Sequence, residues 1–258
     1  MRSRKISRAA VLSGPVVRNA PFSAEATTVV RQTLGDGTRI ERRGNARYYR
    51  DSDGRVRVEQ TIIGLEPVNG AVDPQIRVTI HSDPSKPVAY TLDPVRRVTF
   101  LGPRGIFGLA VGGGETFAVP LGGVRFLQFS DGRRQSRLSE EFGRGGHEIE
   151  EEMLGSRTFS GVEAIGRRLT TTIPTGLFGN DRPLVVVDER WESPELKLLV
   201  YSRHSDPRTG VVEYVVSNIR RGDPPPELFV LPADYTLRTD PSELLITLEP
   251  ALKKEQRK

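Results

Sequence analysis

The sequence predicts a mostly β protein, an antiparallel meander that forms a curved sheet or open half-barrel with few short helices. Apolar and polar residues alternate along several segments, which is the period of a strand. Turn dipeptides separate these segments at short intervals, and long runs with the 3.6-residue period of a helix are nearly absent. The 26 glycines and 19 prolines suit many strands joined by tight turns.

The first strands are separated by glycine-containing turns. Residues 22–34 read as a strand that ends at Gly35-Asp36-Gly37, and residues 38–50 lead to a second turn at Asp53-Gly54. Residues 56–62 then alternate between apolar and polar side chains. A half-buried strand shows this pattern, because successive side chains point to opposite faces of the sheet.

Residues 56–62 and 76–80 have the same alternation. We therefore expect their apolar residues to share one face, with Val58 and Val78 buried. The arginines that alternate with them, Arg57 and Arg77 among others, are expected on a solvated face.

The dipeptide Asp-Pro recurs every ten residues in this part of the chain, at positions 73, 83 and 93. Proline cannot donate to a strand ladder, and the aspartate carboxylate caps a turn, so each pair ends a strand. One strand and one turn per ten residues is the spacing of an antiparallel meander. The same dipeptide returns at positions 206, 223 and 240.

Residues 102–123 are apolar, rich in glycine and without a clear period. Two interpretations stay open: a mobile cover over the sheet that hinges at Gly112 to Gly114, or a disordered insertion. Ile106, Phe107, Leu109 and Phe117 would form an apolar patch if this segment stayed in water. The whole region 102–147 is predicted to be a glycine-rich insertion.

Strands resume after the insertion. Residues 147–154 and 162–174 are predicted strands across a turn at 155–161, and 184–191 is a third, with Val185, Val187 and Trp191 on one face. A hairpin of residues 197–203 and 211–220 follows. Residues 224–231 are expected to hold one short helical turn, with Phe229 and Leu231 on the core.

The composition narrows the function. The net charge of +5 invites a nucleic-acid interpretation, but the arginines are spread along the chain, so we expect no nucleic-acid partner. No cysteine is present, which leaves no thiol chemistry. No apolar run reaches the length of a membrane-spanning helix. The basic residues 1–21 read either as the remnant of a leader or as a disordered arm.

Candidate catalytic groups are sparse. The three histidines, His81, His147 and His204, lie far apart in sequence, and the acidic stretch after His147 reads as a solvated edge strand whose charges deter pairing. Ser202, His204 and a nearby Asp206 suggest a triad only superficially, because all three lie in one strand end and its turn. We expect neither a reaction nor a metal or cofactor.

The second half of the chain resembles a group of uncharacterised bacterial cell-envelope proteins. The segments that carry the resemblance are Gly155-Ser156-Arg157-Thr158, Thr170-Thr171-Thr172-Ile173-Pro174, Gly179-Asn180-Asp181-Arg182-Pro183, Glu189-Arg190-Trp191, Ser193-Pro194-Glu195-Leu196 and Pro232-Ala233-Asp234-Tyr235. This group has no agreed activity. The resemblance implies a periplasmic or secreted location.

More distantly, the strand layout is similar to that of the Lol-type periplasmic lipoprotein carriers. Those proteins shelter acyl chains in an open antiparallel half-barrel under a helical lid. Residues 102–123 depart from that pattern, because they are too rich in glycine for a stable helix.

Two functions follow from the sequence. The first is a non-enzymatic envelope protein that binds a lipid or a lipoprotein acyl chain in the curved sheet. The predicted binding site is lined by Phe107, Leu109, Phe117, Trp191, Tyr201 and Tyr214. The second is an interaction or scaffold module with a filled core, a protein partner in the envelope, and these aromatic residues as ordinary core. The predicted organisation is an arm at 1–21, a single β domain at 22–239 and a charged tail at 240–258.

Overall fold

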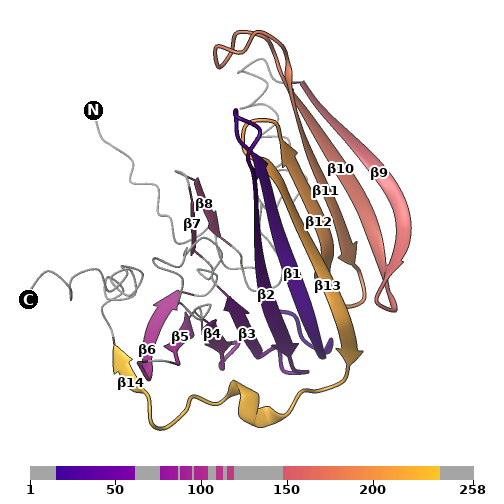
Figure 1. The fold of residues 1–258 in the computed structure, drawn as a ribbon. Helices are drawn as coiled ribbons and strands as arrows, with labels where there is room; N and C mark the ends of the chain where they lie inside the picture. The colour runs from indigo at the N-terminus through magenta and orange to yellow at the C-terminus, as the bar shows by residue number, and fades with distance from the viewer. Residues whose placement is uncertain are drawn as a thin grey trace, which may run out of the picture. The chain divides into compact units, whose positions relative to one another are not determined.

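The computed structural model describes residues 16–61, 76–86, 88–94, 96–103, 109–112, 115–118 and 148–238. Within these ranges lie the strands β1 to β14 and one 3-10 helix, which confirms the mostly β class (Figure 1). Twelve strands form one sheet in the order β14-β6-β5-β4-β3-β2-β1-β13-β12-β11-β10-β9. The two end strands, β14 and β9, are not neighbours, so the sheet is open.

The strand bounds follow the predicted turns closely in most places. They are β1 (Phe22–Thr33), β2 (Arg39–Arg50), β3 (Val56–Thr61), β4 (Ile76–His81), β5 (Val88–Asp93), β6 (Val98–Pro103), β7 (Leu109–Gly112), β8 (Glu115–Ala118), β9 (Glu148–Phe159), β10 (Val162–Ile173), β11 (Leu184–Ser193), β12 (Leu198–Asp206), β13 (Gly210–Arg221) and β14 (Thr236–Arg238).

The chain divides into two compact units. Unit 1 comprises residues 1–23, 46–121 and 221–258, and unit 2 comprises residues 24–45 and 122–220. Both β1 and β2 contribute residues to each unit. The single domain expected at 22–239, with its arm and tail, stays a prediction.

In unit 1 the predicted shared face is wrong. Val58 of β3 is opposite Thr79 of β4, whereas Val78 is opposite Glu59, so Val58 and Val78 lie on opposite faces. Both valines are nevertheless buried. The two strands are offset by one residue from the expected register, and a slip of one residue exchanges the faces.

The burial of both faces explains how this register is tolerated. Val78, Ile80 and Leu92 form a core on one face, against which Tyr90, Leu231 and Tyr235 pack. On the other face Val58, Thr79, His81, Thr91 and Ala89 are buried as well. A sheet covered on both faces does not need strict alternation.

The segment after β13 covers part of unit 1. The 3-10 helix η2 (Pro226–Phe229) buries Phe229, and the Arg55 guanidinium lies 5.1 Å from the centre of its ring. Arg57 donates a hydrogen bond to the Leu228 carbonyl, and its side chain is only 17% exposed. The predicted helical turn is therefore confirmed, and the predicted solvation of Arg57 is wrong because this segment lies over it.

The Asp-Pro pairs punctuate the strands as expected. The Asp83 carboxylate accepts hydrogen bonds from Ser85 in the β4–β5 turn, and that of Asp93 accepts one from the Arg96 amide after β5. Asp206 caps the β12–β13 turn through the Arg208 amide. Asp223 differs, because its carboxylate binds Ser52 in the β2–β3 turn. The pairs at 73 and 240 lie outside the described residues.

Residues 109–118 contain structure that the sequence did not indicate. β7 and β8 form a two-stranded antiparallel hairpin in which Gly112 pairs with Glu115. Residues 113 and 114, the rest of the predicted cover and the side chains of β7 and β8 lie outside the described part of the chain. The choice between a cover and a disordered insertion therefore stays a prediction.

In unit 2 the hairpin of β9 and β10 is longer than predicted. β9 continues to Phe159, and the turn consists of Ser160 and Gly161, both with positive φ. Gly155, which was placed in a turn, lies inside β9 with a φ of 77°. The register with β10 shifts there, so this glycine marks a β-bulge instead of a turn.

Candidate functional site

The register of unit 2 separates its side chains into two faces. On β12 and β13, Tyr201 is opposite Val215 and Arg203 is opposite Glu213, so these four residues share one face. We call it the network face. Ser202 and Tyr214 are opposite one another on the other face, which we call the apolar face.

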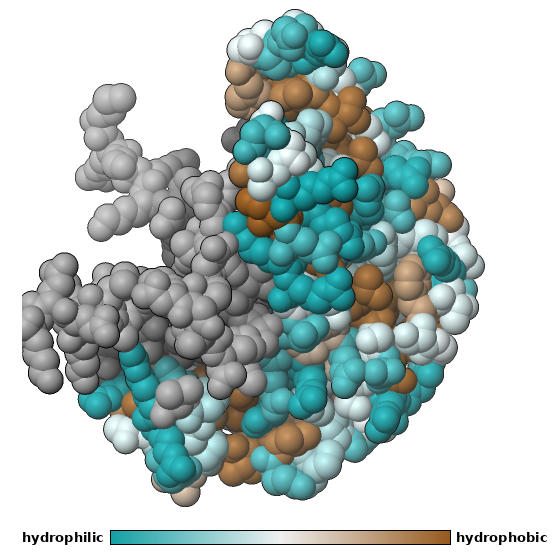
Figure 2. Space-filling model, viewed as in Figure 1, coloured by the Kyte–Doolittle hydropathy of each residue, from teal (hydrophilic) through white to brown (hydrophobic). Residues whose placement is uncertain are grey.

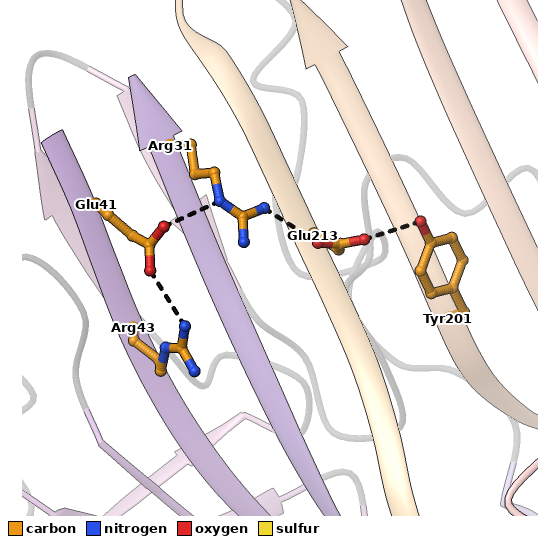
Figure 3. Close-up of polar contacts among 5 residues, drawn as sticks. All are labelled: Arg31, Glu41, Arg43, Tyr201 and Glu213. Atoms are coloured by element: carbon orange, nitrogen blue, oxygen red, sulfur yellow. Dashed lines mark hydrogen bonds and ion pairs between the residues drawn. The ribbon is translucent and has the colours of Figure 1, made fainter. Parts of the chain in front are cut away.

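A chain of hydrogen bonds crosses the network face over β2, β1, β13 and β12 (Figure 3). The Glu41 carboxylate accepts from Arg43 at 3.1 Å and from Arg31 Nε at 3.0 Å. Arg31 also donates to Glu213 at 3.1 Å, and Glu213 accepts the Tyr201 hydroxyl at 3.1 Å. Four strands are thus linked through five side chains.

This network changes the titration of its members. The hydrogen bonds to Glu213 and then Glu41 raise the pKa of Arg31. Hydrogen bonds from Arg43 and then Arg31 lower the pKa of Glu41. Burial, followed by the hydrogen bond to Glu213, raises the pKa of Tyr201 to about 12. The charged forms of Arg31 and Glu41 and the neutral phenol of Tyr201 are therefore the stable states at neutral pH.

An aromatic cluster continues the network face toward β9. The Phe159 ring lies 5.5 Å from Trp191 and 5.8 Å from Tyr201, measured between ring centres. The Trp191 ring lies flat against Gly166, where an added Cβ would come within 2.8 Å of the indole. Trp191 is 6% exposed and is therefore buried within this cluster.

Carboxylates accept hydrogen bonds from the indole N–H of this cluster and from a neighbouring arginine. Trp191 Nε1 donates to Glu189 at 2.8 Å. Arg168 donates to Glu189 at 3.1 Å and to Glu152 at 2.9 Å, and the hydrogen bond to Glu189 is the main cause of the raised pKa of Arg168. Ion pairs and hydrogen bonds therefore occur on the network face from Glu152 of β9 to Glu41 and Arg43 of β2.

The apolar face carries small and apolar side chains on several of the same strands. Tyr214 and Val216 of β13 and Val186 of β11 are buried on it. Ala24 and Ala26 of β1 join them, because Thr27 and Arg31 bond to Asn45 and Glu41 on the network face.

Polar groups interrupt the apolar face near its centre. His204 Nδ1 lies 2.8 Å from the Asp188 carboxylate, and both residues are opposite one another in the register. Ser202 and Arg190 form the next opposite pair. Burial lowers the pKa of Arg190 from its ordinary value, although Asp188 acts in the other direction.

Three of the six predicted ligand-lining residues lie in the described sheet of unit 2 and can be placed on its faces. Trp191 and Tyr201 are opposite one another on the network face. Tyr214 lies on the apolar face, because neighbouring residues of a strand point to opposite sides. Leu109 and Phe117 lie in β7 and β8, and Phe107 is outside the described residues. Their role in ligand binding stays a prediction.

One candidate catalytic group from the sequence can be judged among the described residues. His204 bonds to Asp188 and Asp206 to Arg208, so Ser202, His204 and Asp206 do not form the linear relay of a triad. In the described ranges no three His, Asp or Glu side chains gather as ligands for a metal ion. Within the same ranges there is also no helix with the length and apolarity to cross a membrane.

Sequence reasoning missed Gly166, whose missing side chain makes room for the Trp191 ring. A glycine inside an otherwise regular strand signals close approach by another group, and this signal was available. The network of Arg31, Glu41 and Glu213 left no comparable signal, because 182 residues separate Arg31 from Glu213.

No known protein family matches the sequence, and no curated protein matches it either. Comparison of structures finds distant similarities, among them one to a LolA superfamily protein. The sequence identities show at most a shared fold.

Three solved structures illustrate these similarities. The Pseudomonas aeruginosa MucA/MucB complex matches 84% of this chain and 59% of that chain, with 11% identity and a TM-score of 0.38. A LolA superfamily protein from Nitrosomonas europaea matches 86% and 94%, with 11% identity and a TM-score of 0.31. A DUF1329 family protein from Desulfovibrio piger matches 82% and 90%, with 13% identity and a TM-score of 0.29. The chain thus spans about three fifths of the MucB chain.

Proposed function

We propose that this chain is a non-enzymatic cell-envelope protein that binds an apolar ligand, a lipid or the acyl chain of a lipoprotein, on the apolar face of unit 2. Its place is the periplasm or the cell exterior, which the resemblance of its second half to envelope proteins supports. The observation that carries the proposal is the contrast between the two faces of one sheet.

The described part of unit 2 has a single layer of secondary structure. All of its strands belong to one sheet, and η2, the helix of the described chain, belongs to unit 1. An apolar sheet face must be covered to exclude water. An acyl chain suits such a face, because it adds contact area without needing hydrogen-bond partners. The polar pair of Asp188 and His204 offers a place for the headgroup.

Two valines of β13 provide a matched test. Val212 is opposite His204 on the apolar face, and Val215 is opposite Tyr201 on the network face. Binding of a fluorescent fatty acid to the full chain is measured for Val212→Asp and Val215→Asp. We expect Val212→Asp to weaken binding at least tenfold, because a charge next to the acyl chain must be desolvated. Val215→Asp should bind as the original protein does.

The milder pair Val212→Thr and Val215→Thr covers the case in which an aspartate unfolds the protein. Circular dichroism and a thermal melt confirm folding of each variant. Equal binding by both members of a pair, or no saturable binding by the original protein, would reject the proposal.

The alternative function is an interaction or scaffold module whose core is filled by its own side chains. It predicts no saturable binding of the fatty acid and no co-purifying lipid. Mass spectrometry of an organic extract from the natively purified chain distinguishes the two functions without any substitution.

A further inference from the structure

One edge of the sheet in unit 2 is long and acidic. β9 is the last strand in the sheet order, and eleven of its twelve residues pair with β10 on one side (Figure 1). Half of its backbone N–H and C=O groups therefore point away from β10, and no strand of the described chain pairs with them. Such an edge is a template for the addition of another strand.

The opposite edge of the sheet differs from β9, because a short strand covers it. In unit 1 the short strand β14 pairs with β6 in parallel and so covers three residues of its edge. The long edge of β9 has no such cover from the described chain, and its protection consists of charges and the bulge at Gly155. The bulge limits the regular part of the edge to residues 148–153.

The side chains of this regular part divide strictly between two faces. Glu148, Glu150 and Glu152 are opposite Thr172, Thr170 and Arg168, which places all three on the network face. Ile149, Glu151 and Met153 lie on the apolar face. Met153 is 62% exposed although its side chain is apolar. Figure 2 shows other apolar (brown) areas on the hydrophilic surface of the described residues.

The charges of this edge are only partly compensated. Glu152 bonds to Arg168 at 2.9 Å, and Glu151 lies 3.8 Å from Arg167. Throughout the described chain no ion pair involves Glu148 or Glu150, and both are exposed. A second copy of β9 would place glutamates beside glutamates, which is unfavourable in a cross-strand pair.

We propose that the edge of β9 binds an extended peptide that has Lys or Arg at every second position and apolar residues between them. The peptide adds a strand to the sheet through backbone hydrogen bonds. Its basic residues lie beside Glu148, Glu150 and Glu152, and its apolar residues lie beside Ile149 and Met153. This strand-addition site is independent of the apolar-ligand proposal.

The test uses a labelled peptide, acetyl-Lys-Val-Lys-Thr-Lys-Val-amide, and fluorescence anisotropy with the full chain. We expect Glu148→Lys/Glu150→Lys to weaken binding at least tenfold. Glu163→Lys is the matched control, because Glu163 is equally exposed on β10 but faces no free edge. Binding should remain within twofold of the original value for this variant.

Backbone pairing is tested separately from charge. A peptide of the same sequence with every amide N-methylated keeps its charges but cannot donate to a ladder, so its binding should be lost. Equal binding of the methylated peptide, equal losses for Glu163→Lys, or no binding at all would overturn the proposal. Self-association of the original chain that Glu148→Lys/Glu150→Lys abolishes would also overturn it, because it would assign the edge to a second copy.

Discussion

The network face and the apolar face of unit 2 are built from the same strands, yet they stabilise the sheet in different ways. On the network face, residues distant in sequence are joined by ion pairs and an aromatic cluster around Trp191. On the apolar face, small side chains such as Ala24 and Ala26 are buried, and the pair of His204 and Asp188 forms a polar link near the centre. The comparison shows how a period-two sequence can give the two sides of one layer different side chains.

The largest expected effect concerns the centre of the network face. Trp191→Ala should lower the free energy of unfolding by about 3–5 kcal/mol, because a buried indole is removed from its contacts with Gly166 and Phe159. Denaturant unfolding measures the loss. Fatty-acid binding below the melting temperature should persist, because Trp191 does not lie on the apolar face. A near-neutral midpoint would instead point to a surface or ligand-contact role for Trp191.

A smaller loss is expected for Gly166→Ala. The added methyl group would come within 2.8 Å of the Trp191 ring, and overpacking of this kind costs about 1–3 kcal/mol. Gly102→Ala is the control, since a Cβ there meets no atom within 4 Å. In a double-mutant cycle the cost of Gly166→Ala should shrink when Trp191 is alanine. If Gly166→Ala destabilises the Trp191→Ala variant as much as the original protein, the loss of stability does not come from contact with the Trp191 ring.

The phenol of Tyr201 tests the network through its titration. Because its folded-state pKa is raised to about 12 from the ordinary 10.0, its contribution to stability is complete below pH 10 and is lost as the pH approaches 12. Absorbance of tyrosinate at 295 nm should show one late-titrating phenol that Tyr201→Phe removes. Ionisation of Tyr201 near pH 10 would contradict its burial beside Glu213.

The smallest effect is expected from the exposed ion pairs. Arg31 is about half exposed, so Arg31→Gln should lower the melting temperature only slightly, and the difference should vanish in high salt. Melting curves at low and high ionic strength measure it. A large loss that salt does not reduce would mean that the network holds the strands more firmly than exposed charges usually do.

Much of the fold could be predicted because it depends on local signals. Alternation identified the strands, and Asp83 and Asp93 mark turns through bonds to residues two or three positions away. The helical turn before Phe229 was likewise readable from the sequence. The register between strands could not be predicted, because it depends on which neighbour covers each face of the sheet. Val58 and Val78, which lie on opposite faces, are an example.

The candidate site was less predictable for the same reason. Trp191 and Tyr201 were predicted as part of one ligand-lining group, and the structure places these two opposite one another. Tyr214 was grouped with them, but the parity of the β12–β13 pairing puts it on the other face. A single residue of register therefore decides which side chains meet.

The most direct test of ligand binding on the apolar face is photo-crosslinking with a diazirine-bearing fatty acid, with the labelled residues of β13 identified by mass spectrometry. If the ligand binds on the apolar face, we expect saturable labelling at Val212, Tyr214 and Val216, which share that face. We expect no labelling at Val211, Glu213 and Val215, which alternate with these residues and lie on the network face. Labelling of the second set, or labelling that an excess of unlabelled fatty acid does not reduce, would contradict binding on the apolar face.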